Sequence, residues 1–346
     1  MLIVNKKRLL SVDDWVEIID GLGLADDLTA AHTIAVKPNF AAGTYVEPDG
    51  HVVSDISLVA SFVHYALSLR EDSTVLLAEA DSTGYGFAYL KFEHLGLPGS
   101  LGLSEAELAR VELLDMSRDR LVRAEDPRFL RYMDVDHQLW VSERFARADF
   151  RVDLSNLKTH SVTGYTGACK NLFGCLPETE KWVNHPYIHK TVHDLTLALS
   201  PQLSVVDAFY GMERNGPVQG RPVDSGFRVF SDSPVEADVY GARCAGFDPG
   251  SVEYLRYLLR DLPIDECEFP PLECAPYERP QAFLRVMNAV GLAVQRAGAG
   301  VERFGHKVHT AYSPLVLGVM LLRPLLLRLF DLDTLKAMKR RVMGGR

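Results

Sequence analysis

The 346-residue sequence contains few cysteines and no paired cysteine motif. Its five cysteines are an odd number without CxxC spacing: Cys169, Cys175, Cys244, Cys267 and Cys274. This pattern excludes the disulfide framework of a small secreted protein, and it provides no motif for a zinc ribbon or an iron–sulfur cluster. We therefore expect most of these residues to be buried thiols.

The sequence also lacks an excess of basic residues and an N-terminal apolar run. Its net charge is -9, whereas nonspecific binding to nucleic acid depends on clustered Lys and Arg. The opening residues, MLIVNKKRLLSVDDW, have a short apolar run before the basic residues, which is the wrong order for a secretory signal. We expect a cytoplasmic protein that does not bind nucleic acid.

The most apolar segment, residues 313–330, is interrupted by Arg323 and Pro324. Its longer uninterrupted side has about ten residues, and a membrane-spanning helix needs about twenty. Two interpretations remain open. The segment either forms a buried helix or a homodimer contact, or it contacts a membrane surface with the help of the basic tail KAMKRRVMGGR.

Apolar runs bounded by turn residues alternate with segments of helical periodicity. This alternation predicts an α/β fold with an open, largely parallel or mixed sheet and helices on both faces. Strands are expected at 33–39, 73–80, 110–116, 148–156, 203–209 and 227–232, and helices at 13–22, 54–70, 185–200 and 233–247. We expect Ser54 and Ser233 to be N-caps and Pro186 and Pro234 to be first helical residues.

A stretch rich in proline and acidic residues, 261–280, marks a domain boundary near residue 265. We therefore predict an α/β domain over 1–265, which either is single or has two lobes. A helical C-terminal extension is predicted over 266–346.

Polar side chains follow three of the predicted strands at the point where each strand ends. Parallel strands bring their carboxyl ends to one edge of a sheet, and ligands bind beyond that edge. We expect one site there, built from Lys37 and Asn39, from Glu79 and Asp81, and from Asn156, Lys158 and His160.

The segment SNLKTHSVTGYTGACKNLFGCLP, residues 155–177, is rich in polar groups, which need partners once they are buried. Thr163 and Thr166, with the amides around Gly164 and Gly167, are predicted to form an anion-binding turn before a helix that contains Lys170.

These residues suggest distinct chemical roles. We assign His160 as a general acid or base, Lys170 as a group that holds a carboxylate or phosphate or tethers a cofactor, and Lys37 as a second positive charge. Substrate-binding contacts are expected from Asn39, Lys158, Thr163, Thr166, Asn171, Asp207 and Arg214.

Three histidines, His185, His189 and His193, recur every four residues and share one face if the segment is helical. Imidazoles at this spacing can ligate a metal, with Glu79 or Asp81 completing a shell that suits iron, manganese or zinc. The alternative is a partly exposed helix face without a metal.

The sequence resembles the DUF362 family of uncharacterised proteins. The resemblance is carried by VKPNF, LKTHSVTGYTGACKNLFGCLP, His185, LSVVDAFYGMERNGPVQG and SPVEADVYGARCAGF, within residues 32–250. A shorter segment is similar to the nickel-dependent lactate racemase family: His160, then Thr166, Gly167 and Ala168, then Lys170, with a further histidine at 185 or 189. That similarity implies a nucleotide-derived cofactor carried by the lysine.

Three functions follow as expectations. The first is an enzyme that performs acid–base chemistry of the isomerase or racemase kind, or cofactor-assisted chemistry, on a small anionic substrate. The second is a metal-dependent oxidoreductase. The third is a ligand-binding or cofactor-binding protein without turnover.

Overall fold

The computed structural model describes residues 1–40, 51–82, 87–124, 139–178, 181–217, 220–271 and 274–280, and then residues 282, 286, 288–290, 292 and 293. The described positions in this last group are helical, as the predicted extension requires. The predicted apolar segment 313–330 lies outside the described residues.

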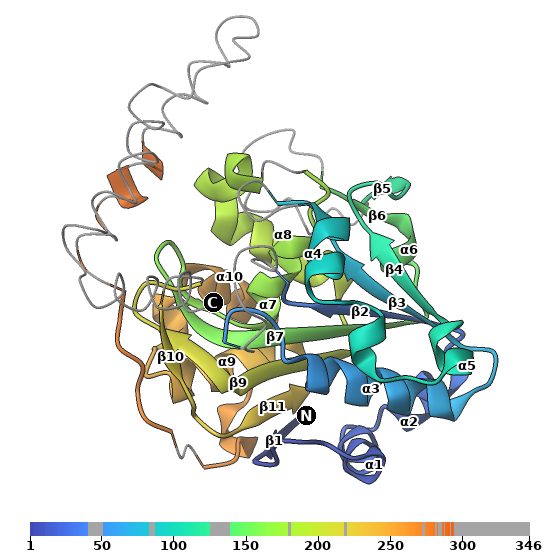
Figure 1. Cartoon of the computed structure of the whole chain (residues 1–346). Helices are drawn as coiled ribbons and strands as arrows, with labels where there is room; N and C mark the ends of the chain where they lie inside the picture. Colours follow the sequence, from blue (N-terminus) through green and yellow to red (C-terminus); the bar gives the residue numbers. More distant parts are fainter. Residues whose placement is uncertain are drawn as a thin grey trace, which may run out of the picture.

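The described strands form a mixed sheet whose centre is parallel (Figure 1). The parallel strands lie in the order β9 (Leu203–Glu213), β7 (Phe150–His160), β2 (Thr33–Pro38), β3 (Thr74–Glu79) and β4 (Val111–Asp115). Antiparallel to β9 lies β11 (Arg228–Ser231), followed by β1 (Leu2–Asn5). The predicted α/β fold with a largely parallel or mixed sheet is therefore confirmed.

Short strands lengthen or flank this sheet. β8 (Gly164–Thr166) pairs with the end of β7, and β10 (Arg221–Val223) pairs with the end of β9. β5 (Leu121–Arg123) and β6 (Trp140–Ser142) pair antiparallel in a separate two-stranded sheet.

Helices cover both faces of the sheet because its strands alternate apolar side chains between two cores. In β2, Ile34 and Val36 pack into the first core with helices α1 (Val12–Gly21), α2 (Ala25–Ala30) and α3 (Ile56–Leu69). Ala35 faces the second core with α7 (Ala168–Asn171), α8 (Ile188–Leu199), α9 (Pro234–Cys244) and α10 (Glu253–Asp261). Figure 1 shows α1 to α3 on one side of the strands, opposite α7 and α8.

Shorter helices complete the described chain. They are α4 (Ala88–His94), α5 (Glu105–Leu108), α6 (Glu143–Ala146) and the 3₁₀ helices η1 (Gly99–Leu101), η3 (Leu172–Cys175), η4 (Lys181–Tyr187), η5 (Pro249–Ser251) and η6 (Glu266–Glu268).

Two of the predicted helix starts were wrong. The side chain of Asp55, not Ser54, caps α3 by accepting a hydrogen bond from the Ser57 amide. Ser54 instead donates to the Leu154 carbonyl at 2.8 Å. Pro186 lies inside η4, and α8 begins two residues later at Ile188. At α9 both predictions hold, because Ser233 caps the helix and Pro234 is its first residue.

The cysteines follow the expectation in part. Cys169 and Cys175 are buried thiols, whereas Cys267 is exposed. Cys244 and Cys274 form a disulfide with Cα atoms 5.2 Å apart, although their sequence separation of 30 residues matches no motif. The pair brings the end of α9 against the proline-rich stretch that was predicted to mark a domain boundary.

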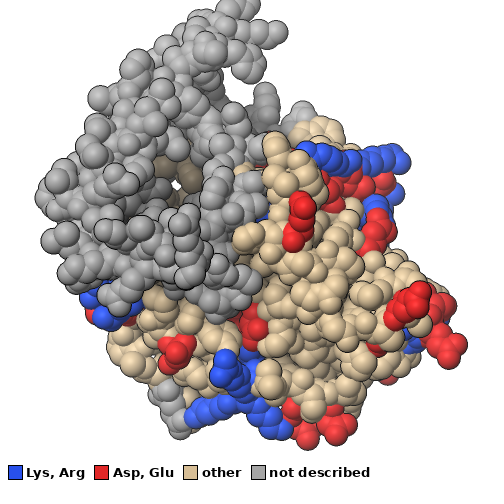
Figure 2. Space-filling model, viewed as in Figure 1, with Lys and Arg blue, Asp and Glu red and all other residues tan. Residues whose placement is uncertain are grey.

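The surface seen in Figure 2 carries acidic and basic side chains in mixed groups over its described part. Among the described residues, no helix is both long enough and apolar enough to cross a membrane.

The chain order of the parallel strands places a topological switch point between β2 and β7. β2 leads to α3 on the first face, whereas β7 leads to α7 and α8 on the second face. Neighbouring strands whose connections leave toward opposite faces open a gap at their carboxyl ends, where α/β proteins bind ligands. The predicted polar residues of β2, β3 and β7 lie around this edge.

Candidate functional site

A group of buried lysines surrounds one carboxylate at the carboxyl ends of β2 and β3. The Lys37 ammonium group donates to Glu79 Oε2 at 3.1 Å, and the Lys91 ammonium lies 3.7 Å from Glu79 Oε1. Both lysine side chains are 1% exposed. The amides of Phe40 and Ala80 also donate to Glu79. The carboxylate is therefore held from several sides.

A third lysine reaches the same place from η4. Lys181 is 8% exposed, and its ammonium group donates to the backbone carbonyl of Asp81. We call Lys37, Lys91 and Lys181 around Glu79 the lysine cluster.

The electrostatics of the lysine cluster perturb its members strongly. Burial alone would raise the pKa of Glu79, but the positive charges of Lys37, Lys91 and Lys181 lower it to about 2. Burial lowers the pKa of Lys181 to about 8 and also lowers that of Lys91, with Glu79 opposing the shift in both cases. Perturbed groups of this kind are typical of functional sites.

The charges in this region do not cancel within the described residues. Arg118 pairs with Asp81 at 3.1 Å and also with Asp115, so four cationic groups face three carboxylates. Burial raises the pKa of the neighbouring Asp153 well above the usual range, with Asn171 and Lys37 opposing the shift. Among these seven groups one positive charge is in excess when all of them are ionised, although Arg118 is half exposed to solvent.

The short helices α7 and η3 pack directly on Lys37. A Cβ atom at Gly174 would lie 3.1 Å from Lys37 Cε and 3.2 Å from its Nζ, so the lysine would have to shift by a few tenths of an ångström to accept it. Asn171 donates to the Lys37 carbonyl at 3.3 Å and to Asp153 Oδ1 at 2.6 Å. Asp153 is fully buried, and its Oδ2 has no hydrogen-bond partner among the residues that the structure describes.

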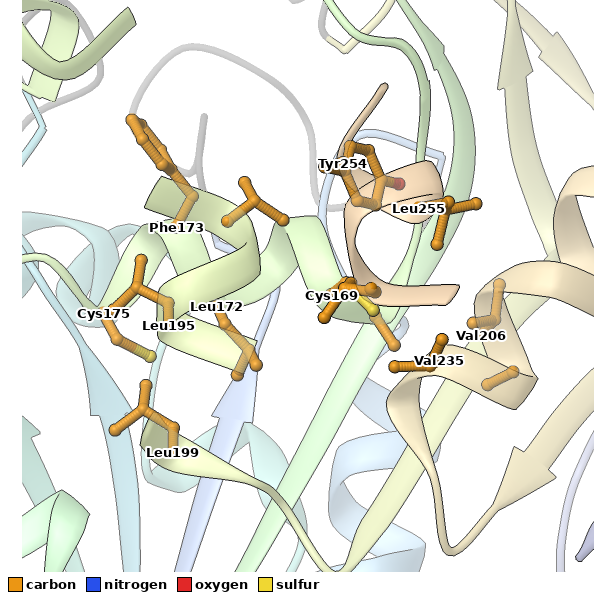
Figure 3. Close-up of a cluster of buried hydrophobic side chains, with 14 of the residues drawn as sticks. Cys169, Leu172, Phe173, Cys175, Leu195, Leu199, Val206, Val235, Tyr254 and Leu255 are labelled. Atoms are coloured by element: carbon orange, nitrogen blue, oxygen red, sulfur yellow. The ribbon is translucent and has the colours of Figure 1, made fainter. Parts of the chain in front are cut away.

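A buried apolar cluster holds α7 and η3 in this position (Figure 3). Leu172 and Cys175 pack with Leu195 and Leu199 of α8 in the second core. At the start of α7, Asp238 of α9 accepts hydrogen bonds from the amides of Ala168 and Cys169 and from the hydroxyls of Tyr165 and Tyr254. Burial raises the pKa of Asp238 to about 7.

Polar residues also meet at the switch point between β2 and β7. Asn39 donates to Asn156 Oδ1 at 3.0 Å, and the buried Lys158 ammonium donates to the Val52 carbonyl at 2.6 Å. The structure thus brings Lys37, Asn39, Glu79 and Asn156 to one edge of the sheet.

His160 lies farther along β7. Its Nδ1 accepts from the amides of Val162 at 3.1 Å and Thr163 at 3.2 Å, so a neutral ring carries its proton on Nε2. Lys37 pairs in register with Asp153, seven residues before His160. At about 3.3 Å per residue, these positions are roughly 20 Å apart along the strand. His160 and Lys37, which were predicted to act in one site, therefore lie in different parts of the structure.

A cavity of about 280 Å³ lies beside the turn that follows His160. Its lining includes Ser161, Thr163, His189 and Glu253, so the structure brings together two of the predicted residues, Thr163 and His189. His189 Nε2 is 3.6 Å from Glu253 Oε2, and its ring stacks on Tyr254.

Lys170 occupies a third position. Its ammonium lies 5.7 Å from the centre of the Phe173 ring, and burial lowers its pKa to about 8. Thr166 belongs to β8, where it pairs with Lys158.

The three candidate metal-ligating histidines have separate partners. His185 belongs to η4 and stacks on Phe173, while His193 is buried between Asp194 at 2.7 Å and Asp261 at 2.9 Å. Because α8 begins only after Pro186, His185 does not share a helix with the other two. In the described part of the chain, no three His, Cys, Asp or Glu residues are arranged to hold a metal.

Two residues that were predicted to contact the substrate form ion pairs with other residues of the chain. Asp207 lies 3.1 Å from the guanidinium group of Arg228, with both side chains 1% exposed. Arg214 donates to Glu278 at 2.7 Å near the surface.

The sequence reasoning missed Lys91, Lys181, Asp153 and Asp238. A charged residue inside the apolar run of β7 was an available signal for Asp153, and an acidic residue among small helical residues was one for Asp238. No local pattern identifies Lys91 or Lys181.

The fold and the carboxyl-edge cluster together define an α/β protein with a polar site beyond its parallel strands. The chain matches the family model described as Domain of unknown function (DUF362) over residues 34–243. This match covers more than half of the sequence, and the chain belongs to this family, as its motifs indicated. It includes every residue of the lysine cluster.

The chain is also similar to a thylakoid-associated protein from Synechocystis sp. The two are 27% identical over 251 residues, which cover 70% of this chain and 72% of the relative.

Proposed function

We propose that this protein is an enzyme that binds a small anionic substrate at the lysine cluster and transfers protons there, in an isomerase-like, racemase-like or cofactor-assisted reaction. The observation that supports the proposal is the gathering of three buried lysines around one carboxylate, Glu79. Isolated charges are costly in a protein interior, and buried ions are normally paired. A bound anion would supply further negative charge beside these lysines.

Lys181 is the member best suited to proton transfer. With a pKa lowered to about 8, its amine changes protonation near neutral pH, where a general acid or base works most effectively. Lys37 and Lys91, which both face Glu79, would attract the anionic substrate.

Calorimetric titration of the full chain with propionate, pyruvate and inorganic phosphate tests the binding step. Saturable binding is expected for at least one of these anions, with affinity lowered at least tenfold in Lys181→Met. The matched control is Lys6→Met, which removes an exposed lysine and should leave affinity unchanged. Equal affinity in both variants, or no binding at all, would refute the proposal.

Turnover separates an enzyme from a carrier that binds without chemistry. Hydrogen–deuterium exchange at the substrate carbons, followed by NMR in D₂O, should show exchange that depends on Lys181. Binding without any exchange or conversion of the bound anions would favour the ligand-binding protein.

The name of the Synechocystis relative supports a further proposal, a peripheral contact with a membrane surface. Flotation of the full chain with vesicles containing anionic lipid would test it, and recovery of all the protein away from the vesicles would contradict it.

A further inference from the structure

We propose that the Cys244–Cys274 disulfide is a redox switch that holds residues 274–280, which we call the strap, on the fold. While the bond is intact, the strap also keeps in place one wall of the cavity beside the turn that follows His160. Reduction by a dithiol releases both. The inference goes beyond the proposed function, because neither cysteine belongs to the lysine cluster.

The two halves of the disulfide differ in accessibility. Cys244 is the last residue of α9 and is 3% exposed, whereas Cys274 is half-buried and begins the strap. The next two residues, Ala275 and Pro276, are exposed. Thiol–disulfide exchange requires a thiolate to approach one of the two sulfurs, so access decides which sulfur is attacked. Cys274 is therefore the residue that a reductant attacks.

The strap has a defined position on the fold while the disulfide is intact. The Tyr277 side chain is buried, its amide donates to the Ala245 carbonyl at 3.1 Å, and its hydroxyl lies 2.9 Å from the hydroxyl of Ser225. A Cβ atom at Gly211 would collide with the Tyr277 hydroxyl, so glycine leaves room for the ring beside β9. The strap therefore packs between the end of α9 and β9.

The side-chain contacts farther along the strap lie at the surface. Glu278 accepts hydrogen bonds from Arg214 at 2.7 Å and from Arg221 of β10 at 2.5 Å, and these three side chains are between 27% and 52% exposed. Exposed ion pairs contribute little to stability because solvent screens them. The covalent bond at Cys274 is therefore the strongest link between the strap and α9.

The chain that follows the strap forms part of the cavity. Asn288, Ala289 and Leu292 line one wall, and the Asn288 side chain donates to the Ser161 carbonyl on the opposite wall at 3.2 Å. Asn288 follows the end of the strap by eight residues. Because the wall is connected to the fold through the strap, loosening the strap loosens the wall.

The redox step balances with a dithiol as the reductant. One thiolate of the dithiol attacks Cys274 Sγ, the Cys244–Cys274 bond breaks, and Cys244 leaves as a thiolate that takes up a proton. The second thiol of the reductant then attacks the mixed disulfide and releases Cys274 as a thiol. Two electrons and two protons pass from the dithiol to the cysteine pair. Exchange with a more oxidising disulfide reverses the step.

Reduction of the folded protein tests the first part of the inference. The full chain is treated with dithiothreitol without denaturant, quenched with acid and examined by peptide mapping. We expect a linked peptide containing Cys244 and Cys274 before treatment and its loss afterwards, with an unchanged far-ultraviolet circular dichroism spectrum. A bond that resists dithiothreitol until the chain is unfolded in urea would overturn the inference, as would a disulfide to Cys267 in place of this pair.

Hydrogen exchange measured by mass spectrometry tests the link to the cavity. After reduction, amides of the strap and of Ser161–Gly164 should exchange about tenfold faster or more, because local opening exposes them, while β2 and β3 stay unchanged. Cys274→Ser should show the fast exchange with or without reductant. The matched control is Cys267→Ser, which removes an exposed thiol outside the disulfide and should behave as the wild type.

The remaining outcomes are equally decisive. Equal exchange in the oxidised and reduced proteins would refute the switch, because the bond would then be a static link. Faster exchange in the strap without any change in Ser161–Gly164 would refute control of the cavity. Anion binding at the lysine cluster is measured separately, so failure of the switch leaves the proposed function standing.

Discussion

Replacing Glu79 by glutamine removes the carboxylate that three buried lysines share. The glutamine side chain would keep the size of the original and one acceptor oxygen, but Lys37 and Lys91 would lose their negative partner. A buried ion pair that loses one member typically costs about 3–5 kcal/mol, because the remaining charge stays buried.

The pKa of Glu79 provides a second estimate of the same quantity. Its value falls from 4.5 in a model peptide to about 2 in the folded protein. At about 1.4 kcal/mol per unit, this shift corresponds to roughly 3 kcal/mol of stability above pH 5. Both estimates give a loss of about 3 kcal/mol for Glu79→Gln at pH 7.

The sign of the pH dependence follows from the direction of the shift. Because folding lowers the pKa of Glu79, this group stabilises the protein fully above the unfolded value of 4.5. Its contribution is lost as pH falls toward about 2. The difference in unfolding free energy between wild type and Glu79→Gln should therefore shrink between pH 5 and pH 2.

Urea denaturation followed by circular dichroism at several pH values measures this difference. The double variant Glu79→Gln/Lys37→Met removes one charge of each sign, so it should be more stable than the sum of the two single variants predicts. A loss below about 1 kcal/mol at pH 7, or additive effects in the double variant, would show that the lysines do not depend on this carboxylate.

Three further predictions concern the supports of the site and the core. Gly174→Ala places a methyl group against Lys37, so it should destabilise the fold by about 1–3 kcal/mol and weaken anion binding in calorimetry; unchanged affinity would contradict the tight contact. Folding raises the pKa of Asp238 to about 7, so the stability that this group contributes is complete below pH 4 and is lost as pH rises through 7. Melting curves should therefore show Asp238→Asn gaining stability relative to wild type from pH 5 to pH 8. The same pH dependence in both proteins would refute this prediction. Trp15→Ala should cost about 3–5 kcal/mol in urea denaturation because Trp15 is fully buried, whereas the exposed Val16→Ala should cost much less.

The sheet and part of the polar edge were predictable from local patterns. Strands buried on both faces appear in the sequence as apolar runs, and the polar residues that end them indicated that Lys37, Asn39 and Glu79 would meet. Lys91 and Lys181 were not predictable, because they come from helices whose positions depend on tertiary packing.

Local sequence patterns also did not predict how far apart residues lie along a strand, or which residues they contact. His160 follows the polar residues of the same strand, but the unusual length of β7 places it away from Lys37. The four-residue spacing of the histidines did not reveal that a 3₁₀ helix precedes α8, nor that His193 is buried between two aspartates.

The length of β7 has a consequence for the kinds of molecule this protein can accommodate. One continuous strand links the lysine cluster, at Asp153, to the cavity that follows His160. A metabolite of three or four carbons can occupy one end only, whereas a ligand that touches both must be an elongated molecule spanning roughly 20 Å. Comparing the binding of short acids with that of long-chain acids would show whether the two ends bind one extended ligand or two separate ligands.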